Sequence, residues 1–205
     1  MKKWIVLGIL AVLFIFILAA IGMVVGTYNS LVVLEQGVQA QWAQVENVYQ
    51  RRYDLIPNLV ATVKGAANFE KSTYMEVTKA RSRVGQITAG AMKNIINDPK
   101  AFAKFEGAQN QLGSALSRLL VTVENYPDLK ATQNFRDLQA QLEGTENRIA
   151  QERRLFNEAA QRYNTRLQTF PTNIIAGFFG GKFAPKPYFK STSGAEKPPK
   201  VDFGK

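Results

Sequence analysis

The chain has 205 residues and a formal net charge of +10, and it contains neither histidine nor cysteine. The missing residue types exclude Ser-His-Asp and Cys-His nucleophile systems, thiol redox centres and nearly all zinc sites. Positive charge gathers at the ends, with Lys2 and Lys3 at the start and six lysines against two acidic residues in 182–205. The middle carries 18 basic and 14 acidic residues, a balance that argues against nucleic-acid binding.

Residues 4–25 form an apolar segment of 22 residues without a charge. As a helix this segment is about 33 Å long, enough for a hydrocarbon core of roughly 30 Å. We therefore predict that 4–25 spans a lipid bilayer as an uncleaved anchor. The alternative is a signal peptide cleaved near Val24–Gly26, although the apolar segment is long for one.

The basic residues beside this segment indicate its orientation. Lys2 and Lys3 precede the segment, and no basic residue follows it until Arg51. Because positive charge is retained on the cytoplasmic side, we expect the amino terminus in the cytoplasm and the rest of the chain outside. The expected location is the cytoplasmic (inner) membrane of a bacterium.

After the span, apolar residues recur every three or four positions, the spacing of amphipathic helices. Four such stretches cover 31–63, 69–91, 102–126 and 135–170. The fold class predicted is all-α, with an amino-terminal transmembrane helix followed by an antiparallel four-helix bundle of long helices.

Prolines divide these stretches. Pro57 predicts a kink near Asp54, and Asp98 followed by Pro99 is typical of a helix start. Pro127 predicts a turn after the third helix, and Pro171 closes the fourth. The chain then divides into an anchor (1–27), the bundle (28–170), an aromatic and basic segment (171–190) and a disordered basic tail (191–205).

The segment 171–190 has two interpretations. Four antiparallel helices return the chain to the membrane, so its aromatic and basic residues suit a membrane interface. Alternatively, the same aromatic side chains cover the open end of the bundle core. The membrane-interface candidates are Phe178, Phe179, Lys182, Phe183, Tyr188 and Phe189.

Two polar clusters could carry chemistry. Glu143 and Glu146 lie one helical turn apart with Arg148 nearby, and without histidine they are more simply explained as members of a helix-surface ion-pair network. The cluster 51–54 places Arg52 on the apolar stripe, where we expect a carboxylate such as Glu152, or Asp54 locally, to pair with it and fix helix register. We predict no catalytic residue, metal site or cofactor.

Several strings resemble those of the bacterial LemA family: WAQVEN at 42–47, RRYDLIPNLV at 51–60, YPDLKA at 126–131 and LEGTENRI at 142–149. The resemblance covers about residues 28–190 and implies a membrane protein with one amino-terminal span and a mostly four-helix soluble domain. It implies no activity. The signature and interaction candidates are Arg51, Arg52, Asp54, Ile56, Pro57, Asn58, Glu143, Glu146, Asn147 and Arg148.

The sequence thus favours a membrane-anchored scaffold or protein-interaction module of the bacterial cell envelope, without enzyme activity. Sustained helical stripes favour self-association or the binding of a membrane-protein partner. The alternatives are an accessory subunit of an envelope protease system, which the family's operon neighbours suggest, and a membrane-shaping protein.

Overall fold

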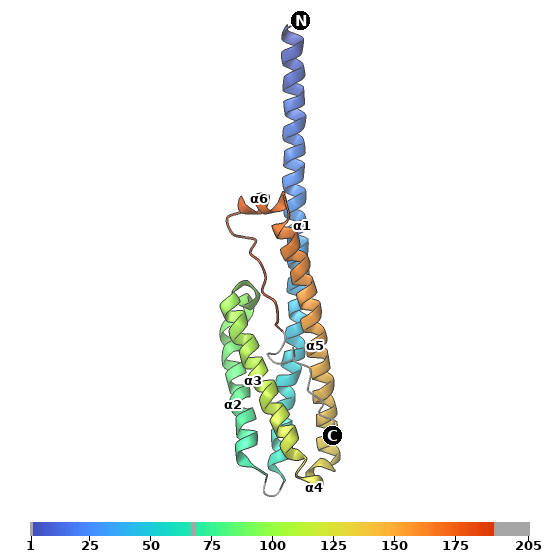
Figure 1. Cartoon of the computed structure of the whole chain (residues 1–205), viewed down its shortest axis with the longest axis vertical. Coiled ribbons are helices and arrows are strands. Elements are labelled where there is room, and N and C mark those ends of the chain that lie inside the picture. Colours follow the sequence, from blue (N-terminus) through green and yellow to red (C-terminus); the bar gives the residue numbers. More distant parts are fainter. Residues whose placement is uncertain (1, 67–68, 191–205) are drawn as a thin grey trace, which may run out of the picture.

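The computed structural model describes residues 2–66 and 69–190 (Figure 1). All regular secondary structure in these ranges is helical, which confirms the all-α fold class with a long apolar helix at the amino terminus. The predicted tail at 191–205 lies outside the described residues. The elements are α1 (Lys2–Lys64), α2 (Lys71–Ala91), the 3₁₀ helix η1 (Met92–Asn97), α3 (Pro99–Val123), α4 (Pro127–Lys130), α5 (Gln133–Gln168) and α6 (Thr172–Gly177).

Helix α1 carries both the apolar segment and the first helix of the bundle. Residues 4–25 are exposed along their whole length, and this segment is long and apolar enough to cross a membrane. The first buried side chain is Thr27, and burial then follows the predicted stripe. No break separates the two parts, so the apolar segment and the bundle share one helical axis (Figure 1).

Helix α1 also continues through Pro57 to Lys64. A proline has no N–H to donate to the carbonyl four residues earlier, which here belongs to Tyr53. That carbonyl instead accepts a hydrogen bond of 3.1 Å from Arg81 Nε on α2. The exposed proline is therefore accommodated within the helix.

The four long helices α1, α2, α3 and α5 lie side by side (Figure 1), which is compatible with the predicted four-helix bundle. Helix α1 packs chiefly against α5, and α2 chiefly against α3. The backbones of α3 and α5 approach each other far less closely. The fold is thus two helix pairs joined through α1 and α2, with a gap between α3 and α5.

Two of the predicted boundaries can be compared directly with the structure. The side chain of Asp98 accepts a hydrogen bond of 2.8 Å from Lys100 N, and Pro99 is the first residue of α3, so this helix start is confirmed. Pro127 lies where we expected only a turn, but it begins the short helix α4.

The segment after α5 covers the part of the core that α2 and α3 do not reach. Helix α6 crosses the end of the bundle that lies next to the apolar segment, and the chain then runs back along the bundle (Figure 1). The ring of Phe189 lies 4.7 Å from that of Phe102 and 5.5 Å from that of Phe156, measured between centroids. The extended segment completes an aromatic core that also contains Trp42.

This packing corrects part of the membrane-interface prediction. Phe183 and Phe189 are 7% and 6% exposed, because they fill the core beside α1 and α5. Phe179 is partly buried against the same cluster. Only Phe178, Lys182 and Tyr188 of the six candidates remain exposed.

Candidate functional site

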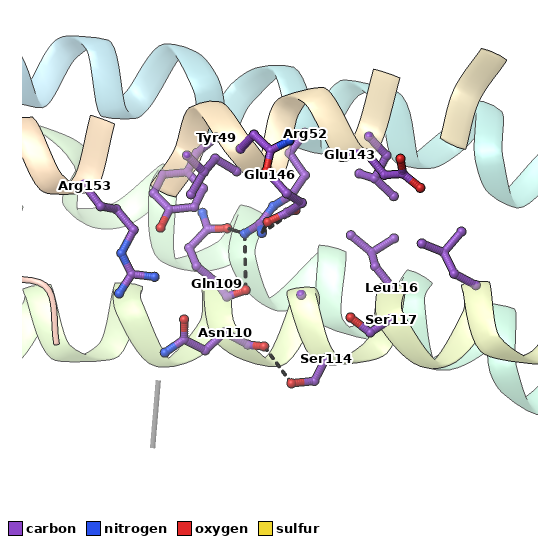
Figure 2. Close-up of a pocket in the computed structure, with 15 residues that line it drawn as sticks. Tyr49, Arg52, Gln109, Asn110, Ser114, Leu116, Ser117, Glu143, Glu146 and Arg153 are labelled. Carbon is purple, nitrogen blue, oxygen red and sulfur yellow. Dashed lines mark hydrogen bonds and ion pairs between the residues drawn. The ribbon is translucent and has the colours of Figure 1, made fainter. Parts of the chain in front are cut away.

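A groove of about 600 Å³ opens between α3 and α5, with α1 behind it (Figure 2). Its walls combine charged, amide and hydroxyl side chains with a few leucines. The lining residues are Tyr49, Arg52, Gln109, Asn110, Gly113, Ser114, Leu116, Ser117, Leu120, Leu142, Glu143, Glu146, Asn147, Ile149 and Arg153.

Arg52 reaches from α1 to both walls of this groove (Figure 2) and is only 3% exposed. Its Nη1 donates to Oε1 and Oε2 of Glu146 on α5, at 2.9 and 3.2 Å. Its Nη2 donates to the backbone carbonyl of Gln109 on α3 at 3.2 Å, and also to the Gln109 side-chain oxygen. Its Nε is buried without a hydrogen-bond partner in the part of the chain that the structure describes.

The predicted cross-bundle role of Arg52 is therefore correct in kind but wrong in partner. Glu152 accepts a hydrogen bond from Gln41 at 2.6 Å, and Asp54 accepts one from Gln50 at 2.8 Å. Since α1 and α5 run in opposite directions, Gln41 lies opposite Glu152, and Arg52, further along α1, lies opposite Glu146, nearer the start of α5. The register of the two helices decides the pairing.

The structure brings together only some of the signature candidates. Arg52, Glu143, Glu146 and Asn147 meet at the groove. Arg148 is exposed on α5 and does not line the groove. On α1 the exposed candidates are Arg51, Asp54, Pro57 and Asn58, whereas Ile56 is buried in the core.

Sequence reasoning missed the residues that bind the extended segment above the groove. Asn164 Nδ2 donates to the carbonyl of Lys186 at 2.8 Å, and the amide of Lys186 donates to Asn164 Oδ1 at 2.8 Å. Asn157 makes the same pair of hydrogen bonds with the backbone of Phe189, both at 2.9 Å. Two side-chain amides on α5 thus bind the backbone as a neighbouring β-strand would.

An ion pair continues this pattern at the upper end of the groove. Arg153 Nη2 lies 2.9 Å from Glu106 Oε1 and also donates to the carbonyl of Lys190 at 2.9 Å. The amide of Lys190 donates to the same Glu106 oxygen at 2.9 Å. Arg153 lines the groove as well, so the groove begins beside Lys190, the last residue that the structure describes.

Lys186 is another buried charge that its position in the sequence did not indicate. It belongs to the aromatic and basic segment 171–190, but its side chain is only 3% exposed. Its Nζ lies 2.8 Å from Glu35 Oε1 and 2.6 Å from Asn97 Oδ1. This lysine fastens the segment to α1 and η1, and no sequence signal marked its partners.

The two basic residues that line the groove, Arg52 and Arg153, are each paired with a carboxylate. Burial raises the pKa of the Tyr49 hydroxyl, and the charges of Arg153 and Arg52 oppose that rise. Among the described residues, no group of three or more Asp and Glu side chains could hold a metal ion. The groove offers hydrogen bonds from both walls.

A smaller pocket of about 300 Å³ lies between α1, α2 and α3 and is lined in part by Glu46 and Tyr53. The indole N–H of Trp42 donates to Glu46 Oε1 at 2.7 Å. Burial raises the pKa of Glu46, and the hydrogen bond from Trp42 partly opposes this rise. This carboxylate is held in place by the aromatic core.

Comparison with known proteins agrees with the resemblance in the sequence. The model of the LemA family matches residues 41–203. Magnetosome protein MamQ 2 of Paramagnetospirillum magneticum is 28% identical over 196 residues, spanning 89% of this chain and 71% of the relative.

Two further relatives come from other organisms. Magnetosome protein MamQ of Magnetospirillum gryphiswaldense is 28% identical over 169 residues, which cover 76% of this chain and 62% of that protein. Protein LemA of Metamycoplasma hominis is 25% identical over 152 residues, which cover 74% of this chain and 64% of that protein. The chain belongs to the LemA family.

Proposed function

We propose that this protein is a membrane-anchored, non-enzymatic interaction module of the bacterial cell envelope, which binds an extended polypeptide segment of a partner in the groove between α3 and α5. One observation carries this proposal. Phe189 and Lys190 already lie at the upper end of the gap between these helices, where Asn157 on α5 binds the backbone of Phe189 and Glu106 on α3 accepts from the amide of Lys190. The groove continues that gap below Lys190.

The groove lining supports a polypeptide ligand. Asn110, Ser117 and Asn147 offer both donors and acceptors along its two walls. The leucines at 116, 120 and 142 give apolar contacts between them. A partner backbone needs this combination, because its N–H and C=O groups must be paired when they leave water.

Arg52 supports the same use by holding the groove in one shape. It links α1 to Glu146 on α5 and to Gln109 on α3, so the two walls are fixed relative to each other across the gap. A site formed before its partner arrives loses less entropy on binding.

The proposed location is the cytoplasmic membrane, with the bundle outside the cytoplasm. Lys2 and Lys3 before the span support this orientation. The length of the apolar segment, 22 residues, supports an uncleaved anchor, because the apolar region of a signal peptide is shorter. Relatives named as magnetosome proteins support a role at a membrane, and a membrane protease would be one partner that fits the proposal.

A cross-linking experiment tests the proposal. The chain has no cysteine, so Asn147→Cys places a single thiol in the groove and Arg148→Cys places one beside it on α5, outside the groove. Each thiol carries a short photoreactive group in native membranes. We expect a discrete adduct from position 147 that is absent from position 148 and is lost when Ser117→Trp fills the groove.

Three outcomes would contradict the proposal. They are equal adducts from both positions, no adduct from position 147, or a cross-link only within the chain, identified by peptide mass spectrometry. Co-expression of two differently tagged copies shows whether the partner is a second copy of this protein.

A further inference from the structure

Three large apolar side chains at the membrane-facing end of the bundle have no partner in the core. Phe170, Ile174 and Phe178 are 73%, 53% and 81% exposed. Ile174 lies in α6, and Phe170 and Phe178 flank this helix, whereas the buried side chains of α6 face the bundle. We call Phe170, Ile174 and Phe178 the α6 ridge.

The height of the α6 ridge relative to the apolar segment is fixed by contacts with α1. The ring of Tyr28 lies 4.9 Å from that of Phe179 and 5.6 Å from that of Phe183, between centroids. Tyr28 follows the last residue of the apolar segment, Val25, by three residues, which is about 4.5 Å of helix. The chain just after α6 therefore meets α1 about one helical turn beyond the end of the apolar segment. Figure 1 shows α6 beside α1 at the end of the bundle where the apolar segment begins.

The polar surroundings of the ridge match a bilayer surface. Lys182 is exposed, hydrogen-bonds the hydroxyl of Tyr28 and lies 4.5 Å from the centroid of its ring. Aromatic rings beside lysine are typical of the interfacial layer, where lysine meets anionic headgroups. A ridge of this kind in water would leave two phenylalanines and an isoleucine solvated at a cost that burial in lipid removes.

We propose that the α6 ridge inserts into the interfacial layer of the same bilayer that α1 spans. This inference rests on the membrane anchoring proposed above. The bundle is then attached at two points, by α1 through the membrane and by α6 upon it. Two attachments fix the tilt of the bundle, and hence the orientation of the groove, relative to the lipid surface.

Spin labelling tests this proposal in the full-length protein, since no native thiol interferes. Single variants Phe178→Cys and Ile174→Cys are reconstituted in vesicles of phosphatidylcholine with a minority of phosphatidylglycerol. Matched controls are Leu13→Cys, within the span, and Val121→Cys, exposed near the opposite end of the bundle. For each spin label, the collision rate with oxygen, which enters lipid, is compared with the collision rate with a nickel chelate, which stays in water.

We expect labels at 174 and 178 to collide several-fold less with the nickel chelate than the label at 121, and to lie shallower than the label at 13. Labels at 174 and 178 that match the one at 121 would overturn the proposal while leaving the span intact. A label at 13 that is open to the nickel chelate would overturn both the proposal and the anchoring. Dipolar broadening that disappears on dilution with unlabelled protein would assign the ridge to a second copy, which also overturns it.

Discussion

Arg81 on α2 supplies the hydrogen bond that Pro57 on α1 cannot make. The guanidinium Nε donates to the carbonyl of Tyr53 at 3.1 Å, and its carbon lies 3.7 Å from the centroid of the Tyr53 ring. The defect in one helix thereby becomes a contact between two helices. It explains how an exposed proline is tolerated inside α1.

Arg81→Ala should lower the free energy of unfolding by roughly 1–3 kcal/mol, because the Tyr53 carbonyl loses its donor. In a Pro57→Ala background the loss should be smaller, since residue 57 then donates to that carbonyl itself. Urea unfolding in detergent of the two single variants and the double variant measures this coupling. If Arg81→Ala lowers the free energy of unfolding equally in both backgrounds, Arg81 does not compensate for the hydrogen bond that Pro57 cannot make.

Glu146→Ala should destabilise the bundle by roughly 2–3 kcal/mol, because it leaves the guanidinium of Arg52 buried without its carboxylate. The loss should stay below that of a fully buried pair, since the Glu146 side chain is 42% exposed. Adding Arg52→Met to Glu146→Ala should restore part of the stability. If the double variant loses as much as the two single variants together, the ion pair contributes no coupling.

Asn164→Leu should release the extended segment, because the backbone N–H and C=O of Lys186 both lose their partner. The free energy of unfolding should fall by roughly 2–4 kcal/mol. Hydrogen exchange at the amides of Lys186 and Phe189 should accelerate more than exchange in α3. Asn125→Leu, at an exposed position after α3, is the matched control and should change neither quantity.

The pH dependence of stability should include a contribution from Glu46. Burial raises the pKa of Glu46 in the folded protein above the ordinary 4.5. The protonated carboxyl therefore stabilises the folded state fully at a pH below the pKa of the unfolded chain, and this stabilisation is lost as the pH rises through the pKa of the folded protein. Glu46→Gln removes this titration and keeps an oxygen that can accept from Trp42. The wild type should therefore lose stability relative to Glu46→Gln as pH rises through the folded pKa, measured by urea unfolding at a series of pH values. A difference that does not change with pH would contradict the raised pKa.

Local signals in the sequence were sufficient to predict the four long helices, but not the short helices η1, α4 and α6. The stripe of apolar residues and the pair Asp98–Pro99 predicted α3 and its first turn, because capping and periodicity depend on neighbours within a few residues. The partner of Arg52 could not be predicted in the same way. It depends on the register between α1 and α5, and several carboxylates on α5 satisfy the same expectation.

Whether the aromatic residues of 171–190 are buried depends on how far each helix extends along the bundle, and no local sequence pattern contains that information. Phe183 is buried against α1 beyond the reach of α2 and α3, and Phe189 is buried between Phe102 on α3 and Phe156 on α5. An extended segment has no helical period, so its contacts with Asn157 and Asn164 left no signal in the spacing of residues.

The unbroken helix α1 has a mechanical consequence. A membrane span joined to its domain by a flexible linker can turn without turning the domain, but here the bundle is an extension of the span. One residue inserted beside Gly26 would rotate the bundle by about 100° about the α1 axis and move it by about 1.5 Å. Any rotation of the span inside the bilayer would likewise rotate the bundle and its groove, because no flexible linker lies between them.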